Sequence, residues 1–547
     1  MVVPMILLTM VARWLFIFYR AAKKFRNYGF LYRNSSRLHQ VFSLYSSVTK
    51  CCLDGREAQS IICDFEGTLL RSSSLFPYFM LVAFEGGSIL RAFLLLLSFP
   101  FLWALGHHGG LSMRVMVFIT FCGLKTKNMN LVARAVLPKF YLETLHLQAY
   151  EVLASTGRKV VLTGMPRVMV EGFLKEYLSV DEVVGTELQV VRGSYFTGLI
   201  SGRVLSQKQK VLKDLFGETK ADLTLLNPSN PHDHLFLSHC KEAYVVSKED
   251  PTKTTGSMNA VMPRNKYPRP LIFHDGRLAF FPTPLATLAL FLYLPMGIAL
   301  VTIRIVLGLI LPYNVAMVIG ALTGVRFRVD GLNPSTMNAK TSGGKGKGVL
   351  YVCTHRTLLD PVMLSAALQR SVPAVTYSLS PLSEMMSPIK AVRLRRDREP
   401  DAETMRRLLG EGDLAVCPEG TTCREPYLLR FSPLSAELAD EIVPVAIDTK
   451  VPMFYGTTAS GHKWLDPVLF FMNPMPEYRL QFMERVPREM TCSGGRRSGA
   501  EVANWIQRQL AEALGFECTA LTRRDKYMML AGNEGVVRKR PERKSTE

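Results

Sequence analysis

An apolar stretch in the middle of the chain places the strongest constraint on its fold. Residues 284–325 contain a single charged residue, Arg304, and the stretch on either side of it is about 20 residues long, the length that a helix needs to cross a bilayer. Pro295 and Pro312 are positions where such helices bend. The stretch predicts two membrane-embedded helices or one re-entrant hairpin, and a buried pair of core helices is the alternative.

The regions on both sides of this stretch have the pattern of α/β domains, in which short apolar strands alternate with helices around a parallel sheet. We expect strands at 58–64, Lys159–Leu162, Leu223–Leu226, Val349–Cys353, Ala374–Tyr377, Leu414–Cys417 and Ile442–Ile447, and helices at Pro361–Gln369, Asp401–Leu409 and Ala500–Leu514. Pro444 favours an edge position for the last strand, because proline cannot donate to a neighbouring strand.

The domain divisions follow changes in composition along the chain. Residues 246–270 are rich in Ser, Thr, Lys and Pro, which is typical of a linker. The predicted organisation is a basic N-terminal anchor or targeting segment (1–53), an α/β domain (54–245), the linker (246–270), the membrane-embedded helices (284–325), a second α/β domain (330–530) and a basic tail (531–547).

The charge balance restricts the partners. The net charge is +20, which suits nucleic acid or an anionic lipid surface. The chain has no zinc-finger spacing, no basic heptads and no RNP-like strand, so we expect membrane lipid and no nucleic acid. The 10 cysteines include no Cys-x-x-Cys pair, which favours a reducing compartment.

The first 53 residues contain no Asp or Glu, and Val2–Tyr19 is apolar except for Arg13. No cleavage site of a secretory signal follows, which favours an uncleaved anchor with a basic cytosolic flank, while a mitochondrial address or a disordered arm are the alternatives. We expect a membrane location, at the endoplasmic reticulum in preference to the mitochondrion.

Two shorter apolar runs lie inside the first α/β domain, at Ala92–Leu105 and Val115–Leu124. Both are shorter than a membrane span. We expect buried or interfacial helices there, with membrane insertion as the second possibility.

A histidine and a carboxylate at the start of the second domain predict general-base chemistry. His355 and Asp360 are five residues apart, so a continuous helix would place them on different faces. However, a strand ends near Cys353, and Asp360-Pro361 is a strong helix start with Asp as N-cap. Asp360 can therefore fold back from the helix start and hold the imidazole of His355 in the loop. A histidine held in this way can deprotonate a hydroxyl group near neutral pH.

Two further segments suit an anionic substrate. Val392–Arg398 is dense in Arg, and a guanidinium binds phosphate through two hydrogen bonds. Leu414–Thr422 is a strand that runs into a Gly-containing polar turn, which can present amides and hydroxyls to an anion.

These segments, with Val443–Val445, resemble the glycerolipid acyltransferase family. Longer stretches look like the plant-type glycerol-3-phosphate acyltransferases that prefer the sn-2 position, and the resemblance covers most of residues 60–535. It is carried by Tyr427–Pro433, Phe454–His462 and Leu521–Tyr527.

The resemblance implies transfer of an acyl group from acyl-CoA to glycerol 3-phosphate, giving lysophosphatidic acid for glycerolipid or cutin- and suberin-type lipid synthesis without a cofactor. His355 would be the general base and Asp360 its orienting partner. Arg396 would hold the glycerol phosphate together with Glu419, Gly420 and Thr421. Arg396 is preferred over Arg393, Arg395 and Arg398 because it follows the strand-like alternation. The acyl chain would lie near Pro284–Val325.

Asp64-Phe-Glu-Gly-Thr-Leu69 in the first domain resembles the first motif of haloacid dehalogenase (HAD)-type phosphatases, which implies a HAD-like doubly wound sheet. That motif requires Asp-x-Asp, in which the first Asp attacks phosphorus and the second is acid and base. Glu66 stands at the second position, and its extra methylene displaces the carboxyl by ~1 Å, a shift that can cost about 10²-fold in rate.

The remaining phosphatase motifs are also depleted. Thr163 matches the second-motif hydroxyl, Lys208 or Lys210 stands for the third-motif lysine, and Asp233 is the single acid left in the last motif. We therefore expect a folded domain without phosphatase activity and without a metal. The alternatives are a bifunctional acyltransferase and phosphatase that releases monoacylglycerol, a lysophosphatidic acid acyltransferase, and a non-catalytic lipid-binding scaffold.

Overall fold

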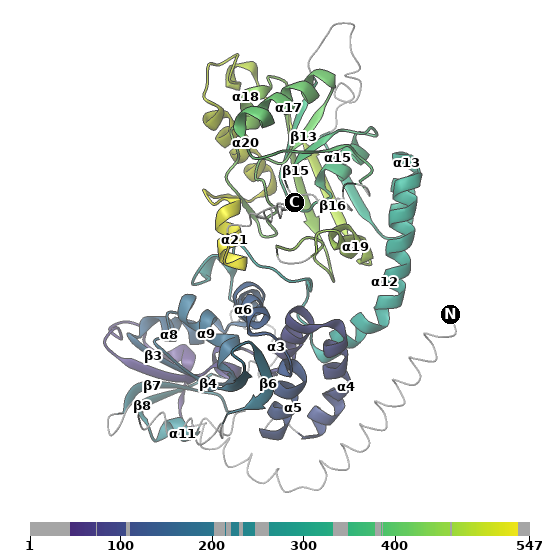
Figure 1. Cartoon of the computed structure of the whole chain (residues 1–547). Coiled ribbons are helices and arrows are strands. Elements are labelled where there is room, and N and C mark those ends of the chain that lie inside the picture. Colours follow the sequence, from purple (N-terminus) through teal and green to yellow (C-terminus); the bar gives the residue numbers. More distant parts are fainter. Residues whose placement is uncertain are drawn as a thin grey trace, which may run out of the picture. The chain divides into compact units, whose positions relative to one another are not determined.

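The computed structural model describes residues 44–72, 74–105, 110–201, 214, 220–228, 234–246, 262–331, 348–377, 384, 387–459 and 462–533. The chain forms two compact units (Figure 1). Unit 1 comprises Met1–Leu271 with Phe281–Leu292, and unit 2 comprises Ile272–Phe280 with Tyr293–Glu547. The expectations for residues 1–43, Lys208, Lys210, Asp233 and the tail from residue 534 lie outside the described residues.

Unit 1 is built on a parallel six-stranded sheet. Its order is β1 (Ser46–Ser47), β8 (Cys240–Val245), β7 (Ala221–Leu226), β2 (Ser60–Asp64), β3 (Arg158–Pro166) and β4 (Glu182–Thr186). The sheet is doubly wound: β3 and β4 follow β2 to one side, whereas β7 and β8 lie on the other. Such a reversal opens a crevice at the carboxyl ends of the strands. Asp64, the last residue of β2, lies at this point.

The chain between β2 and β3 forms a set of helices. They are α3 (Phe76–Leu81), α4 (Ile89–Leu105), α5 (Gly110–Phe121), α6 (Thr126–Ala135), α7 (Leu137–Thr144) and α8 (Leu147–Ser155), and α9 (Arg167–Glu176) follows β3. An antiparallel hairpin, β5 (Leu188–Val191) and β6 (Tyr195–Ile200), packs on the end of α5, where the rings of Phe121 and Phe196 are 5.4 Å apart.

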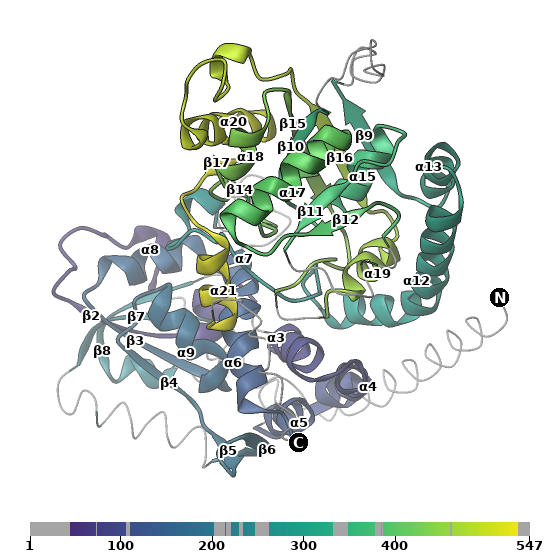
Figure 2. The ribbon, with the colours of Figure 1, turned by 45° about the horizontal axis from the view of Figure 1, so that its top comes forward.

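Unit 2 contains a seven-stranded sheet (Figure 2). Its order is β12 (Ala391–Arg393), β11 (Ala374–Thr376), β13 (Leu414–Val416), β10 (Leu350–Cys353), β15 (Ile442–Lys450), β16 (Glu477–Phe482) and β9 (Arg326–Asp330). The β15–β16 pair is antiparallel and the other pairs are parallel.

Helices cover both faces of the unit 2 sheet, which explains why its central strands β13, β10 and β15 read as continuous apolar runs. Leu350 and Val352 face a core formed with α17 (Arg398–Glu411), α18 (Leu434–Leu438) and α20 (Gly499–Leu514). Tyr351 and Cys353 face a core formed with α15 (Asp360–Ala367) and α19 (Leu465–Met472). A short pair, β14 (Tyr427–Leu428) and β17 (Glu517–Cys518), and α21 (Arg523–Ala531) complete the unit.

The edge position predicted from Pro444 is wrong, because β15 is central, between β10 and β16. The carbonyl of Pro444 accepts from the Met483 amide at 3.0 Å, so the proline nitrogen faces β16 as well. The last paired residues on that side are Val445 and Phe482. Pro444 thus lies where the antiparallel ladder ends, and its missing N–H costs only a terminal rung.

The apolar stretch is not divided at Arg304. One helix, α12 (Pro284–Ile310), runs through Pro295 and Arg304, and α13 (Tyr313–Leu322) follows after Pro312. The residue before a proline is disfavoured in helical conformation, which explains the break at Leu311. Among the described residues, α12 is the one helix that is long and apolar enough to cross a membrane, with a mean hydropathy of 2.2 over its best window.

Arg304 does not interrupt α12, because its charge is used inside unit 2. Its guanidinium donates to the carbonyls of Phe471 and Asn473, at 2.6 Å each, and to those of Thr323 and Pro474. These carbonyls lie at the ends of α19 and α13, where helices leave acceptors without partners. The arginine therefore ties α12 to both helix ends.

Candidate active site

His355 and Asp360 meet in the loop between β10 and α15, as the sequence predicts. The Nδ1 atom of His355 lies 3.0 Å from an oxygen of Asp360, which is fully buried. The same carboxylate accepts from the backbone amides of Arg356 and Thr357, at 2.7 and 3.0 Å, and from the hydroxyl of Tyr478. Asp360 is the first residue of α15, and Leu359 holds the N-cap position without a side-chain cap. The carboxylate thus orders the preceding loop and does not cap its own helix.

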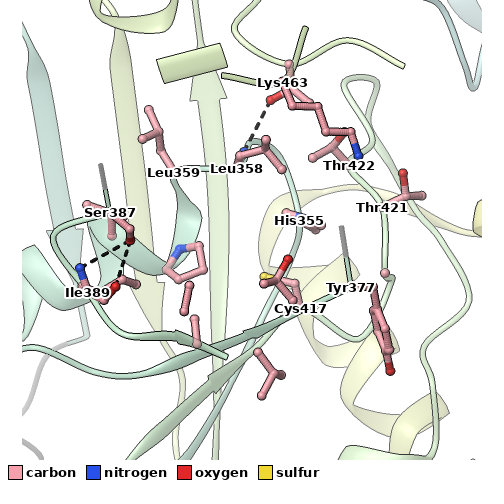
Figure 3. A pocket seen from close by; sticks show the side chains of 18 of the residues that line it. His355, Leu358, Leu359, Tyr377, Ser387, Ile389, Cys417, Thr421, Thr422 and Lys463 are labelled. Atoms are coloured by element: carbon pink, nitrogen blue, oxygen red, sulfur yellow. Dashed lines mark hydrogen bonds between the residues drawn. The ribbon is translucent and has the colours of Figure 1, made fainter. Parts of the chain in front are cut away.

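This geometry determines how His355 can react. A carboxylate accepts hydrogen bonds, so Nδ1 carries the proton and Nε2 carries the lone pair. No residue that the structure describes is a hydrogen-bond partner of Nε2, and His355 lines a cavity of about 260 Å³ (Figure 3). A histidine oriented in this way can accept a proton from a hydroxyl group in the cavity.

Glu419 lies behind His355 and does not line the cavity. Its carboxylate accepts from the amide of His355 at 2.7 Å and from that of Leu429 at 2.9 Å. Burial raises the pKa of Glu419 to about 7. The residue was predicted to hold substrate, but its two oxygens are used to fix the backbone of the histidine loop.

The turn that follows β13 borders the cavity through Gly420, Thr421 and Thr422. Gly420 has a φ of +64°, a conformation that favours glycine. Arg356 holds the chain after this turn, because its buried guanidinium donates to the carbonyls of Cys423, Arg424 and Glu425. Since β10 and β13 are neighbours, the histidine loop and the turn are locked together at one edge of the sheet.

Arg396 lies at the rim of the site. It follows β12 in a loop, with a φ of +68°, and is not part of the strand whose alternation suggested it. The amides of Arg395 and Arg396 donate to the buried carboxylate of Asp401, at 2.8 and 3.0 Å. The guanidinium of Arg396 stacks over the ring of Tyr377, which lines the cavity, at 5.6 Å.

Besides Arg304, whose guanidinium holds the ends of α13 and α19, three cations that sequence reasoning missed line the cavity: Lys463, Arg523 and Lys526. Lys526 donates to the carbonyl and the hydroxyl of Thr422, at 2.6 and 3.1 Å, and burial lowers its pKa to about 8. Burial and the nearby charge of Arg396 lower the pKa of Arg523. The signal was present in the segment Leu521–Tyr527, which the family resemblance includes, but nothing local connects it to His355.

The cavity also has an apolar lining. Apolar side chains come from strand β11, from the loops and helices around the sheet and from α12: Val375, Leu358, Val362, Ile389, Phe471, Ile305 and Leu309, with Gly308. Figure 3 shows apolar side chains, such as Leu358 and Leu359, and the cationic Lys463 around His355. The cavity therefore offers an apolar lining and a cluster of cations to the same molecule, or to two molecules that meet at His355.

Cys417 also approaches the pair. Ligand atoms of His355, Asp360 and Cys417 lie within 4.8 Å of one another, a spacing at which three residues could share a metal ion. Burial raises the pKa of the Cys417 thiol well above its usual value, so the thiol stays protonated. Asp360 is already saturated by hydrogen bonds, which makes this group a poor metal site.

The phosphatase-like residues of unit 1 come together at the carboxyl end of β2. Asp64 is buried and accepts from the Phe65 amide at 3.2 Å. The carboxylate of Glu66 accepts from the hydroxyl of Thr163 and from the amides of Gly164 and Met165, at 3.2 and 3.0 Å. A hydroxyl beside two consecutive amides is a set of donors suited to an anion. Glu66 fills that set with its own carboxylate.

Comparison with known proteins finds a HAD-like domain and an acyltransferase domain in this chain. Residues 60–246 match the family model for the HAD-like domain of RAM2-like glycerol-3-phosphate acyltransferases, and residues 328–451 match the acyltransferase model. The chain is 51 % identical to glycerol-3-phosphate acyltransferase 1 of Arabidopsis thaliana, over 95 % of this chain and 96 % of that protein. The chain belongs to the glycerol-3-phosphate acyltransferase family.

Two further relatives support the same assignment. Glycerol-3-phosphate acyltransferase RAM2 of Petunia hybrida is 47 % identical over 87 % of this chain and 98 % of its own length. Probable glycerol-3-phosphate acyltransferase 3 of Arabidopsis thaliana is 44 % identical over 96 % of this chain and 98 % of its own. The expected fold class, a HAD-like α/β domain followed by an α/β acyltransferase domain, is confirmed.

Proposed function

We propose that this acyltransferase moves an acyl group from acyl-CoA to a hydroxyl of glycerol 3-phosphate and releases lysophosphatidic acid and CoA. The observation that carries the proposal is the orientation of His355. Its Nδ1 is held by Asp360, while Nε2 has no partner among the described residues, beside a cavity with both cationic and apolar linings.

In this mechanism Nε2 of His355 accepts the hydroxyl proton while the oxygen attacks the thioester carbonyl. The tetrahedral intermediate then collapses, the carbon–sulfur bond breaks, and the imidazolium returns its proton to the departing thiolate. Asp360 stabilises the imidazolium, as a buried carboxylate does for histidine in hydrolases. Glu419 positions His355 through its backbone amide. No cofactor takes part.

The lining of the cavity supports an orientation for both substrates. The phosphate of glycerol 3-phosphate suits the cations Lys463, Arg523 and Lys526, with Arg396 at the rim and Gly420 and Thr421 in the adjoining turn. The acyl chain suits Ile305, Gly308 and Leu309 of α12. This assignment revises the phosphate site expected from sequence, since Glu419 is used elsewhere and α21 contributes two cations.

We further propose that unit 1 does not hydrolyse phosphate, so that lysophosphatidic acid is the final product. Glu66 occupies the anion-binding donors around Thr163. A substrate phosphate would have to displace a carboxylate that has three donors already.

We also propose a membrane location, which the length and composition of α12 support. We propose the endoplasmic reticulum, with the mitochondrion as the alternative, and a role in glycerolipid or cutin- and suberin-type lipid synthesis. Substrates with long acyl chains partition into membranes, so a cavity lined by α12 would receive them there.

Membranes that contain the expressed chain, supplied with labelled glycerol 3-phosphate and acyl-CoA, test the proposal. His355→Ala is expected to lower transfer by about 10²–10⁴-fold, the usual contribution of a general base. His462→Ala, a change at an exposed histidine of the same unit, is the matched control and should retain activity. Equal activity of both variants would contradict the proposal.

A further inference from the structure

Helices α4 and α5 of unit 1 present an apolar face to the outside. The exposed large side chains on α4 include Leu90, Phe93, Leu94, Leu97 and Phe101, whose spacing places them along one side of the helix. Their exposed fractions run from 39 % to 66 %. The opposite side of α4 packs inward through Ala92, Leu95, Leu96 and Leu102. The helix is apolar all round, which is typical of a deeply buried helix or one in lipid.

The face continues onto the neighbouring helix and lacks negative charge. Leu111 and Phe118 of α5 are 54 % and 51 % exposed. Arg91, the one charged residue of α4, is turned to α5 and donates to the carbonyls of Thr120 and Cys122 at 2.5 and 2.8 Å. Residues 86–142 contain no Asp or Glu. An apolar face on a segment whose charged residues are all basic suits an anionic lipid surface.

The same face adjoins the beginning of α12. The ring of Phe93 on α4 lies 5.2 Å from that of Phe291, in the part of α12 that belongs to unit 1. Trp103, 39 % exposed, lies near the other end of α4. Tryptophan is enriched at the boundary between lipid and water. The apolar face is therefore continuous with the helix proposed to enter the membrane.

We infer that α4 and α5 form a second membrane contact, a helical pair of the HAD-like domain that lies in the interfacial layer of the bilayer beside the beginning of α12, the part up to Leu292 that belongs to unit 1. Neither helix has the length of a span. Insertion by about 5–10 Å would bury the exposed face and leave the sheet of unit 1 in water. The domain would then serve to seat the enzyme on its membrane, a role that needs no phosphatase chemistry. The inference rests on the membrane location proposed above for α12.

Photo-crosslinking in membranes tests this contact on the full chain. A benzophenone side chain is placed at Leu97, which is 41 % exposed, at Leu53, which is 40 % exposed in the same unit, and at Ile298, which is 58 % exposed on α12. We expect phospholipid adducts at Leu97 at least about tenfold above those at Leu53. Thermal unfolding in detergent checks that each variant folds, and Leu90 replaces Leu97 if that variant does not.

The outcomes separate this inference from the proposed membrane placement of α12. Adducts at Ile298 without adducts at Leu97 would overturn the inference and leave α12 in the membrane. A crosslink from Leu97 to a second copy of the chain, or to another segment of the same chain, would also overturn it, since the face would then be covered by protein. None of these readings depends on acyl transfer.

Discussion

Both α/β units place a glutamate carboxylate among backbone amides at the carboxyl edge of their sheets, with opposite consequences. In unit 2, Glu419 accepts from the amides of His355 and Leu429 on the side away from the cavity. In unit 1, Glu66 accepts from Thr163, Gly164 and Met165, the donors that an incoming anion would use. The first carboxylate supports the proposed general base from behind, and the second occupies the place that we propose an anionic substrate would otherwise take.

We propose from this comparison that the position of the hydrogen-bonded groups decides whether such a sheet end can react. His355 keeps one nitrogen without a described partner, whereas the donors around Thr163 already have an acceptor. Parallel sheets with loops at their carboxyl ends provide sites in general. The chemistry depends on which polar groups the fold leaves available.

The largest expected effect distinguishes Asp360, the first residue of α15, from Asp64, the last residue of β2. Asp360→Asn should lower acyl transfer by about 10²–10⁴-fold, because the amide no longer holds Nδ1–H and stabilises the imidazolium poorly. Asp64→Asn should leave transfer within about twofold of the wild type. Initial rates with labelled glycerol 3-phosphate measure both, and a comparable loss in the two variants would contradict a division of labour between the units.

A smaller effect is expected from the glutamates. Glu419→Gln replaces one acceptor by an NH₂ group, so either the His355 or the Leu429 amide loses its partner, at a cost of about 1–3 kcal/mol. We expect kcat to fall at least about tenfold with a small change in KM. Glu66→Gln should leave kcat unchanged. Steady-state kinetics of the Glu419→Gln and Glu66→Gln variants tests whether Glu419 acts through the loop that carries His355.

The strands and the His355–Asp360 pair could be predicted from the sequence because the signals are local. A buried strand followed by a polar loop and Asp-Pro places both side chains within a few residues. The cations of the cavity could not be predicted in this way, because Lys463 and Arg523 are far from His355 in the sequence and line the same cavity only in the folded unit. Glu419 was recognised as part of the site, but its direction depends on Leu429, which the pattern does not connect to it.

The expectation that the apolar stretch divides at Arg304 was wrong for a related reason. A charge within an apolar run suggests a break, but Arg304 finds the carbonyl ends of α13 and α19 in the folded unit. The acceptors at the end of α19 are 167 and 169 residues away in the sequence. Pro444 was misplaced likewise, because the end of the β15–β16 ladder depends on the partner strand.

The cation cluster gives a prediction about substrate affinity. Arg523→Gln should raise the KM for glycerol 3-phosphate about tenfold and change kcat by less than about twofold, since the cation binds phosphate and does not take part in proton transfer. Arg524→Gln, a change at the exposed neighbour in α21, is the control. A rise in the KM for acyl-CoA instead would mean that Arg523 binds a phosphate of CoA and not the phosphate of glycerol 3-phosphate.

The same cluster predicts a pH dependence. Burial lowers the pKa of Lys526 to about 8, so the side chain is charged below that pH and neutral above it. The KM for glycerol 3-phosphate should therefore rise several-fold as the pH increases through about 8. Lys526→Met should have a higher KM at neutral pH and lose this rise. A pH profile of kcat/KM for both proteins gives the answer.

The smallest effect is expected in unit 1. Glu66→Ala empties the donors around Thr163, so inorganic phosphate should stabilise this variant by about 1.4 kcal/mol at ten times its Kd. That corresponds to a rise of a few degrees in Tm. Phosphate can bind the cations of unit 2 in both proteins, so the rise in Tm should be larger in the variant than in the wild type by this amount, and acyl transfer should be the same in both. Equal stabilisation of the two proteins by phosphate would mean that Glu66 does not fill the site.

The most direct test of the central claim is the identity of the product. Membranes that contain the chain are supplied with labelled glycerol 3-phosphate and acyl-CoA, with and without Mg²⁺, and the lipids are separated by chromatography. We predict lysophosphatidic acid alone under both conditions. Monoacylglycerol that forms only with Mg²⁺, and that disappears in Asp64→Ala, would show that the edge of the unit 1 sheet is an open and active site.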